Sequence, residues 1–227
     1  MKFKLLIFDL DNTLLDYEMA ENYALDETFK YFKLESTEEL KESFRIINEE
    51  NWQKLEKGEI TSVELRVLRF EQFGRTQGLK WNPNEVSRIY LENLGRGGFI
   101  IEGADVLLED LKKHFRLASV TNGISDVQRA RLENSSFDGY FNPLVISDEV
   151  GVAKPDPEIF RILLEKANIT DKESVLMIGD SLTSDIMGAA AFGIPSCWYN
   201  PKNLPSDSDI SPDFTITNLE EIRDIVL

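Results

Sequence analysis

The sequence predicts an α/β fold, a Rossmann-like parallel sheet with helices on both faces, into which a bundle of helices is inserted. Three observations predict it. A short apolar run from Lys4 to Phe8 is typical of a buried strand. Helical periodicity alone fills the stretch from Leu15 to Gly98. From Gly103 onward, strand and helix patterns alternate at the spacing of parallel strands joined by right-handed crossovers.

The inserted stretch contains four expected helices, near 18–33, 37–57, 62–77 and 84–95. Capping residues mark several of their starts: Ser36 with Glu39, Thr61 with Glu64, and Asn82 with Pro83. Four helices with no strand between them indicate a small bundle. We therefore expect residues 16–98 to form one unit, and residues 1–15 together with 99–227 to form the other.

Two hinges are expected between these units, at Leu15–Glu18 and at residues 95–99. Gly95, Gly97 and Gly98 lie in the second hinge. Glycines in such a cluster could form a phosphate loop, but no complete nucleotide fingerprint surrounds them, so a flexible return from the bundle is favoured.

The alternation after the bundle defines the rest of the sheet. Strands are expected near 116–121, 143–147, 174–179, 195–199 and 213–216, and helices near 103–113, 125–134, 157–168, 183–192 and 218–226. Ser125 and Gln128 could cap the second of these helices. The proline-containing segment from Asn200 to Asp213 is expected to be a surface loop.

The composition limits what the chain can bind. Its 227 residues carry 25 basic and 41 acidic side chains, a net charge of −16, which disfavours binding of a nucleic acid polymer. The chain could still bind a small phosphorylated ligand if nearby basic side chains or a metal ion make the local electrostatic potential positive. Nothing in the sequence points to a protein partner.

The sequence also favours a cytoplasmic location. Cys197 is the only cysteine, so no intramolecular disulfide can form and a reducing compartment is the simplest assumption. No apolar run approaches the ~20 residues that a membrane span requires. Asp9 ends the N-terminal apolar run too early for a signal peptide. We expect no contact with a membrane.

Polar residues collect where the predicted strands end, which is where ligands bind in parallel sheets. They are Asp9 and Asp11 after the first strand, Thr121 and Asn122 after the second, Lys154 after the third, and Asp180 with Asp185 after the fourth. Each also has a structural interpretation as a turn residue, a solvated charge or a partner of a helix dipole. Their joint placement favours a site.

Charge balance predicts a metal ion in that site. Like charges ~4 Å apart repel by about 4 kcal/mol at an effective dielectric constant of 20, so Asp9, Asp11, Asp180 and Asp185 need counter-charge. Lys154 supplies one unit. A divalent cation with oxygen ligands, most plausibly Mg²⁺, would supply the rest and hold phosphate oxygens.

The chain resembles the haloacid dehalogenase-like phosphohydrolases, a family of Mg²⁺-dependent enzymes. The matching motifs are Asp9-Leu10-Asp11-Asn12-Thr13, Thr121-Asn122-Gly123, Lys154-Pro155, and Gly179-Asp180 with Asp185. All four stand in the family's order on the expected elements. The inserted bundle resembles the helical cap that these enzymes place between the first and second motifs.

The resemblance implies a role for each residue. Asp9 would be the nucleophile that forms an aspartyl-phosphate, and Asp11 the general acid and base. Thr121 and Asn122 would hold the phosphoryl oxygens, and Lys154 would neutralise Asp9. Asp180 would bind Mg²⁺ together with the Asp9 carboxylate and the Asp11 carbonyl, and Asp185 would act through Lys154 or metal-bound water. Dehalogenase members lack the second acid, so Asp11 favours phosphoryl transfer.

The substrate is suggested by a narrower resemblance to the branch that contains pyrimidine nucleoside 5′-monophosphate phosphatases. It is carried by Asn51-Trp52, residues 58–62, Arg66, residues 69–71 and residues 146–154. Trp52 and Arg66 are the predicted substrate contacts outside the motifs, although aromatics in a bundle are usually core. A sugar-phosphate or phosphoglycolate phosphatase, a β-phosphoglucomutase-like isomerase, and a non-catalytic binding module remain open alternatives.

Overall fold

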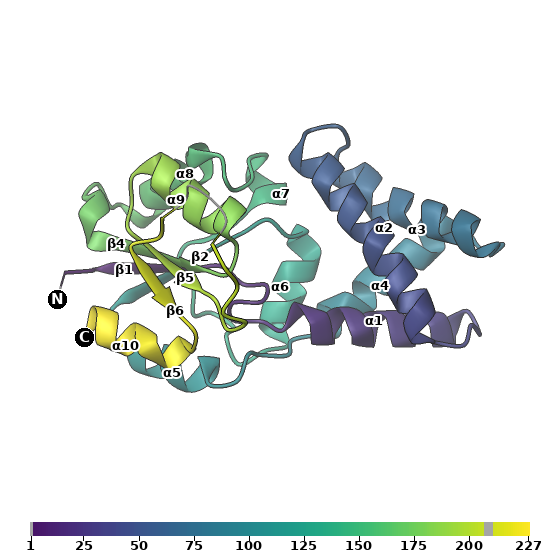
Figure 1. Cartoon of the computed structure of the whole chain (residues 1–227), viewed down its shortest axis with the longest axis horizontal. Coiled ribbons are helices and arrows are strands. Elements are labelled where there is room, and N and C mark those ends of the chain that lie inside the picture. The colour runs from purple at the N-terminus through teal and green to yellow at the C-terminus, as the bar shows by residue number, and fades with distance from the viewer. Residues whose placement is uncertain (1, 207–210) are drawn as a thin grey trace.

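The computed structural model describes residues 2–206 and 211–227. The described strands form one parallel sheet with the order β3-β2-β1-β4-β5-β6, and Figure 1 shows this sheet beside the bundle of helices. The predicted α/β class is confirmed. β1 lies in the middle, with Leu6 opposite Leu117 on one side and Leu176 on the other. The strands are β1 Leu5–Phe8, β2 Arg116–Thr121, β3 Leu144–Ile146, β4 Val175–Gly179, β5 Ser196–Tyr199 and β6 Phe214–Ile216.

The helices follow the predicted ranges to within a few residues. The bundle consists of α1 Tyr17–Tyr31, α2 Glu38–Glu56, α3 Ser62–Gln77 and α4 Pro83–Arg96. The helices around the sheet are α5 Ala104–Leu111, α6 Ser125–Glu133, α7 Ser147–Val150, α8 Pro157–Ala167, α9 Met187–Phe192 and α10 Ile222–Val226. Short helical turns η1 Lys172–Ser174, η2 Leu182–Ile186 and η3 Leu219–Glu221 complete the described elements.

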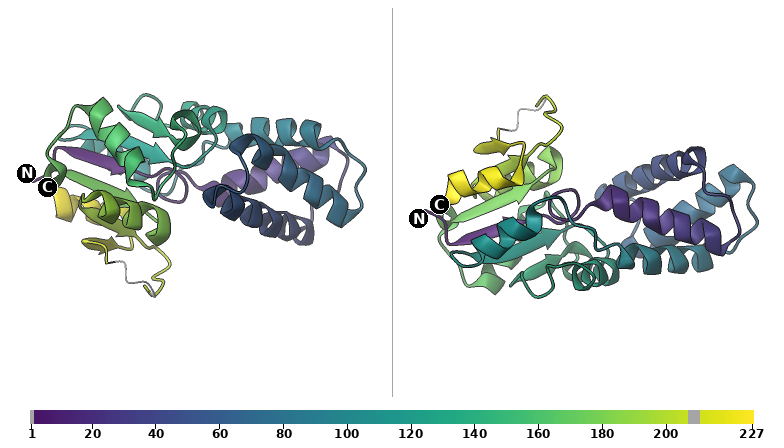
Figure 2. Two further views of the ribbon diagram at one scale, coloured as in Figure 1. Left: turned by 90° about the horizontal axis from the view of Figure 1, so that it is seen from above. Right: turned by 90° about the horizontal axis from the view of Figure 1, so that it is seen from below.

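The bundle extends from one end of the sheet and is joined to it by two segments that run side by side (Figure 2). Asp16 N donates to Phe99 O at 3.0 Å, and Leu15 pairs with Ile100 in an isolated bridge. Gly95 lies inside α4 rather than in a hinge, and a Cβ there would be 3.0 Å from Ala130 Cβ of α6. Its smallness therefore serves helix packing.

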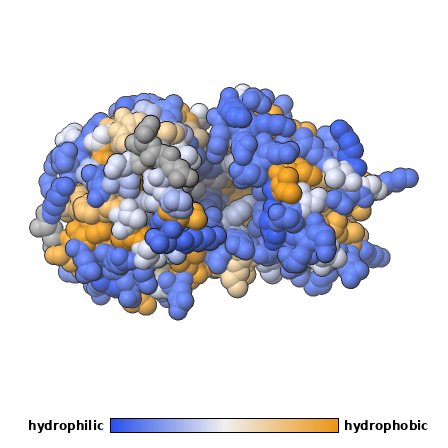
Figure 3. Space-filling view, in the orientation of Figure 1, coloured by the Kyte–Doolittle hydropathy of each residue, from blue (hydrophilic) through white to orange (hydrophobic). Residues whose placement is uncertain are grey.

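The visible face of the molecule is mostly hydrophilic, with scattered apolar patches (Figure 3). Such a surface agrees with the net charge of −16. Among residues 2–206 and 211–227, the helices are all too short or too polar to cross a bilayer.

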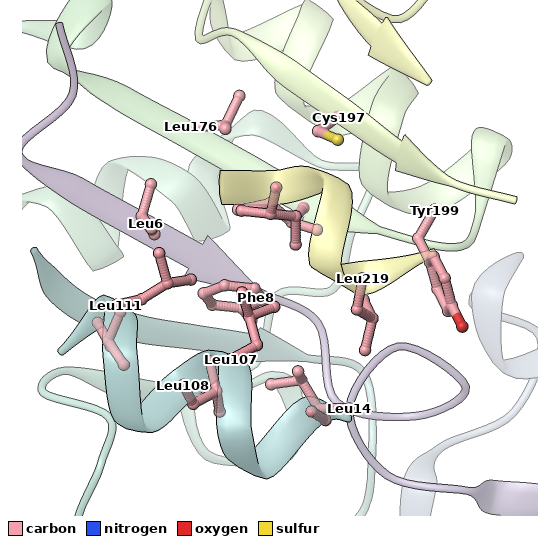
Figure 4. Packing of buried hydrophobic residues seen from close by; sticks show 14 of the residues in the cluster. Leu6, Phe8, Leu14, Leu107, Leu108, Leu111, Leu176, Cys197, Tyr199 and Leu219 are labelled. Carbon is pink, nitrogen blue, oxygen red and sulfur yellow. The ribbon is translucent and has the colours of Figure 1, made fainter. Parts of the chain in front are cut away.

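Alternate residues of β1 enter two separate cores, because successive side chains of a strand point to opposite faces. Phe8 points toward Leu107 and Leu108 of α5 (Figure 4). Leu5 and Ile7 belong to the other core, which contains residues of α8 and α9. Both faces of the sheet are therefore covered, and all four residues of the central strand β1 are buried.

A third core lies within the bundle. Its largest members are Phe29, Phe44, Phe70, Phe73 and Tyr90, all fully buried. The helix α6 contributes Val127 to this bundle core and Leu132 to the sheet core. Truncating a buried Phe to Ala typically costs about 3 to 5 kcal/mol, so each of these aromatics contributes substantially to the stability of the bundle.

Several predicted helix starts differ from the observed ones. Thr37 caps α2 by accepting a hydrogen bond from Leu40 N, whereas the predicted cap Ser36 donates to Asp26. The capping box of Thr61 and Glu64 and the cap Asn82 are confirmed. The predicted helix 183–192 begins as the π-helical turn η2, and α7 was not predicted. Residues 207–210 of the predicted surface loop lie outside the described residues.

Candidate active site

The ends of the three central strands bring the predicted residues together. Asp9 follows β1, Thr121 is the last residue of β2, and Asp180 follows β4. Because β1 lies between β2 and β4, the three side chains reach the same edge of the sheet. Asp9 and Thr121 are buried, with exposed fractions of 6% and 1%. The strand order therefore brings Asp9 next to Thr121 and Asp180, which lie more than 100 positions later in the sequence.

Lys154 lies at the centre of the site and is 3% exposed. Its Nζ donates to Asp9 Oδ1 at 2.5 Å, to Asp185 Oδ1 at 2.7 Å and to Val120 O at 3.0 Å. Burial by itself would lower the pKa of Lys154, but the carboxylates of Asp185 and Asp9 outweigh it and raise that pKa above its ordinary value. The ammonium group is therefore charged at any physiological pH.

Asp9, Asp180 and Asp185 form an acidic cluster in which one oxygen of each lies within 4.8 Å of the others. Burial raises the pKa of Asp9 well above its ordinary value, against the opposing charge of Lys154. Burial and the neighbouring charge of Asp185 raise the pKa of Asp180 to about 7. One ammonium group does not balance three carboxylates, so the cluster is short of positive charge.

The cluster suits a hard divalent cation. Such ions prefer carboxylate oxygens, and their charge would remove the repulsion that raises the pKa of Asp180. The side chain of Asp11, which the sequence also assigned to the metal, lies outside the cluster. Its predicted contribution through the main-chain carbonyl stays a prediction.

Two features hold the acidic residues in place. Asp185 Oδ2 accepts a hydrogen bond from Ser181 N at 3.0 Å, and a Cβ on Gly179 would lie 2.2 Å from that oxygen. Only glycine lets the carboxylate approach the strand end so closely. Trp198 Nε1 donates to Asp180 O at 2.8 Å, which fixes the main chain at the other acid.

The side chain of Asn122 clamps the loop that carries Lys154. Asn122 Nδ2 donates to Lys154 O, and Lys154 N donates to Asn122 Oδ1, both at 2.8 Å. We predicted that this amide holds phosphoryl oxygens. In the structure this pair uses one of the two amide hydrogens and the amide oxygen, so the second hydrogen is not part of the pair and the phosphoryl contact stays a prediction.

Thr121 keeps its hydroxyl hydrogen available for a ligand. Its Oγ1 accepts from Gln128 Nε2 at 2.8 Å and from Gly123 N at 3.3 Å. A hydroxyl that accepts two hydrogen bonds still has its own hydrogen to donate. Thr121 lines the cavity that contains Asp9, so this hydrogen suits the predicted contact with a phosphoryl oxygen.

Gln128 and Arg131 of α6 are site residues that the sequence did not reveal. Gln128 Nε2 donates to Asp11 Oδ2 at 2.9 Å, and Arg131 Nη1 donates to Asp11 Oδ1. The predicted cap by Ser125 and Gln128 is wrong, since Ile124 precedes α6 and no side chain caps it. The only sequence signal was their i, i+3 spacing, which on a helix places both on one face.

A cavity of about 290 Å³ is lined by Asp9, Asp11 and Asp185, and a cleft of about 870 Å³ shares lining residues with it. Trp52 lines both of them, and its contact with the substrate stays a prediction. Tyr17 and Asn48 line the smaller one from the bundle side. The site therefore lies between the sheet edge and the bundle, and an aromatic face borders it.

Arg66 does not reach the acidic cluster. Its guanidinium pairs with Asp126 of α6 and with Asp148 of α7, each at 3.0 Å. These ion pairs join the bundle to the sheet region, and the substrate contact by Arg66 stays a prediction. Electrostatic complementarity of this kind orients two surfaces toward each other.

Comparisons with known proteins agree with this site. A family model described as haloacid dehalogenase-like hydrolase matches residues 3–193. The pyrimidine 5′-nucleotidase YjjG of Escherichia coli is 32% identical over 226 residues, which cover 100% of this chain and 99% of the relative. The pyrimidine 5′-nucleotidase PynA of Streptococcus pneumoniae is 33% identical, over 99% of this chain and 95% of the relative.

A solved structure gives the same result for the fold. The HAD-hydrolase YfnB of Bacillus subtilis, in a crystal structure bound to magnesium that reveals interdomain movement, superposes with a TM-score of 0.92. It is 33% identical, and the match covers 100% of this chain and 99% of that one.

Proposed function

The chain belongs to the haloacid dehalogenase-like hydrolases, and from this premise we propose that it is a Mg²⁺-dependent phosphohydrolase acting on nucleoside 5′-monophosphates, with pyrimidine nucleotides preferred. The observation that carries the proposal is the pairing of buried Asp9 with Lys154 beside a cavity that Trp52 lines. The two relatives named as pyrimidine 5′-nucleotidases support the choice of substrate.

In the first step, a carboxylate oxygen of Asp9 attacks phosphorus, and the bond from phosphorus to the nucleoside oxygen breaks. Asp11 gives that oxygen a proton, so the nucleoside leaves as a neutral alcohol. In the second step water attacks the aspartyl-phosphate, Asp11 takes its proton, and inorganic phosphate leaves Asp9. Lys154, bound to Asp9 Oδ1, favours the ionised form of the nucleophile against the effect of burial.

Asp9 and Asp180 are the residues that would hold the metal ion, and Asp185 lies in the same acidic cluster while it pairs with Lys154. When bound, Mg²⁺ supplies positive charge to the carboxylates and to the phosphoryl oxygens. The chain itself supplies the hydrogen of Thr121 to a phosphoryl oxygen. Burial of Asp9 keeps bulk water from competing with the substrate.

The bundle would act as a cap over the site. We divide the chain into a core of residues 1–15 and 99–227 and a cap of residues 16–98. The two connecting segments lie side by side at Asp16 and Phe99, which suits a hinge. In this arrangement Trp52 and Tyr17 face the leaving nucleoside, and Trp52 would stack on its base.

The experiment is a panel of phosphorylated metabolites assayed with Mg²⁺ and with a chelator. We expect hydrolysis of pyrimidine nucleoside 5′-monophosphates, loss of activity with chelator, and loss of activity in Asp9→Asn. Strong hydrolysis of a sugar phosphate or of phosphoglycolate without nucleotide turnover would refute the substrate but not the chemistry. Product analysis separates hydrolysis from isomerisation, because an isomerase leaves the phosphate on the sugar.

A further inference from the structure

Two buried polar side chains of α6 meet Asp11 and have no part in the chemistry above. Gln128 and Arg131 are 1% and 0% exposed. They bind the two oxygens of Asp11, Gln128 at Oδ2 and Arg131 at Oδ1. An apolar side chain would fill the same space without desolvating a charge, so packing alone does not account for an arginine at this position.

We propose that Gln128 and Arg131 are positioning residues that hold the Asp11 carboxylate in the orientation in which it accepts a proton, and that they couple this orientation to the segments joining bundle and sheet. The proposal rests on the role of Asp11 given under the proposed function. Neither side chain needs to touch the substrate for this purpose.

Positioning requires two fixed points, because the side chain of an aspartate otherwise rotates about two bonds. Gln128 is itself fixed, since its Nε2 also donates to Thr121 Oγ1 at 2.8 Å and its Oε1 accepts from Arg131 Nη1 at 3.2 Å. The acid and Thr121 therefore belong to one hydrogen-bond network. A general base must lie within hydrogen-bond reach of the proton that it takes.

The network fixes both oxygens of Asp11. Oδ2 accepts a hydrogen bond from Gln128 Nε2, and Oδ1 accepts one from Arg131 Nη1. In the proposed reaction the carboxylate is the form that takes the proton of the attacking water. Loss of the network should therefore slow hydrolysis of the aspartyl-phosphate most.

Arg131 also connects Asp11 to both ends of the bundle. Its Nε donates to Gly97 O at 3.1 Å, where α4 ends. Its guanidinium carbon lies 5.7 Å from the centre of the Tyr17 ring, where α1 begins. A movement of either connecting segment would thus move the arginine that binds Asp11.

The test uses p-nitrophenyl phosphate, whose leaving group needs no proton, in stopped-flow and steady-state assays of Arg131→Met and Gln128→Leu. We expect a burst of p-nitrophenolate close to one per enzyme molecule, followed by steady turnover at least about 100-fold slower than in the wild type. Acid quenching followed by intact-protein mass spectrometry should then show accumulated aspartyl-phosphate. Asp11→Asn provides the reference for complete loss of the base.

The matched control is Arg129→Met, on the same helix. The Arg129 side chain is 50% exposed and pairs with Glu149 at 2.8 Å, away from Asp11. Its steady turnover should stay within about twofold of the wild type. Arg131→Lys keeps the charge without the planar fork and should recover only part of the lost rate. Gln128→Leu changes no charge. If Arg131→Met does not fold, Gln128→Leu alone tests the proposal.

A burst and a steady rate that fall together, with no aspartyl-phosphate accumulating, would overturn the positioning proposal. Wild-type turnover in either Arg131→Met or Gln128→Leu would overturn it as well. These outcomes differ from failure of the proposed function, which would show as a wild-type protein that hydrolyses neither nucleotides nor p-nitrophenyl phosphate.

Discussion

Lys154 is the residue on which the charge balance of the site depends. Its Nζ contacts three oxygen atoms, those of Asp9, Asp185 and the Val120 carbonyl, so all three of its hydrogens are used. Removing it would leave two buried carboxylates without their partner. Its loss should therefore affect stability as well as activity.

Replacing Lys154 by methionine should lower the free energy of unfolding by about 3 to 5 kcal/mol, because breaking a buried ion pair leaves uncompensated charge. Urea denaturation of the metal-free protein measures this change. Phosphatase activity should be lost at the same time. The matched variant is Lys154→Met with Asp185→Asn, which removes one of the abandoned charges. It should recover part of the stability and none of the activity, and no recovery would contradict the assigned charge balance.

The raised pKa of Asp180, about 7 against an ordinary value of 3.8, gives the metal-free protein a pH dependence. The folded state holds a proton on Asp180 that the unfolded state releases, so this contribution to stability is complete below about pH 4 and is lost as the pH rises through about 7. The raised pKa of Asp9 acts in the same direction.

Mg²⁺ should therefore raise the melting temperature more at about pH 8 than at about pH 5, because protons and metal compete for the same carboxylates. At 100 times its dissociation constant, an ion stabilises by about 2.7 kcal/mol, or roughly 5 to 10 °C for a chain of this size. Thermal melts with and without Mg²⁺, at matched ionic strength, measure the shift. Asp180→Asn should lose most of it, and equal shifts at both pH values would contradict this account.

At the scale of single elements, α2 carries Trp52 to the cavity of the site. Stacking of a base on an aromatic ring is worth about 1 to 3 kcal/mol. Trp52→Ala should therefore raise KM for a pyrimidine nucleoside 5′-monophosphate roughly 5- to 150-fold, while KM for p-nitrophenyl phosphate changes much less. Trp52→Phe should keep most of the affinity. Tyr31→Ala, which removes a 55% exposed aromatic of the same bundle, should leave both KM values unchanged.

The ion pairs of Arg66 on α3 with α6 and α7 predict a different behaviour. Partly exposed pairs contribute about 0 to 1 kcal/mol each, so Arg66→Met should lower stability only slightly. If Arg66 orients the bundle rather than the base, the ratio of kcat/KM values between pyrimidine and purine nucleotides should stay constant. Steady-state kinetics on one nucleotide of each class decide this. A ratio that changes would support the predicted substrate contact by Arg66.

The sequence predicted helices and strands, because their patterns are local. It did not predict which distant residue a side chain would bind. Asp9, Thr121 and Asp180 were placed correctly because strand ends are readable in the chain and parallel order brings them together. Gln128 has the spacing of a capping residue, yet it binds Asp11, 117 positions earlier in the sequence. Tertiary structure decides whether such a glutamine caps its own helix or binds a distant carboxylate, and the periodicity of the sequence does not reveal the outcome.

For the whole molecule, the alternation of strands and helices predicted the sheet, and the run of four helices predicted the bundle. Their contact was not predictable, because it depends on α6, which places Val127 in the bundle core and Leu132 in the sheet core. The pattern of apolar residues on one helix does not reveal that the helix packs into two separate cores. The ion pairs of Arg66 with α6 and α7 were not predicted for the same reason.

The three tryptophans of the chain occupy three distinct surroundings. Trp81 is packed against Phe73 within the bundle, Trp198 donates to the Asp180 carbonyl, and Trp52 borders the cavity. The molecule thus carries its own fluorescent reporters. Emission that changes on adding Mg²⁺ should disappear in Trp198→Phe, and a further change on adding nucleotide should disappear in Trp52→Phe, so titrations can follow the two ligands separately without any attached dye.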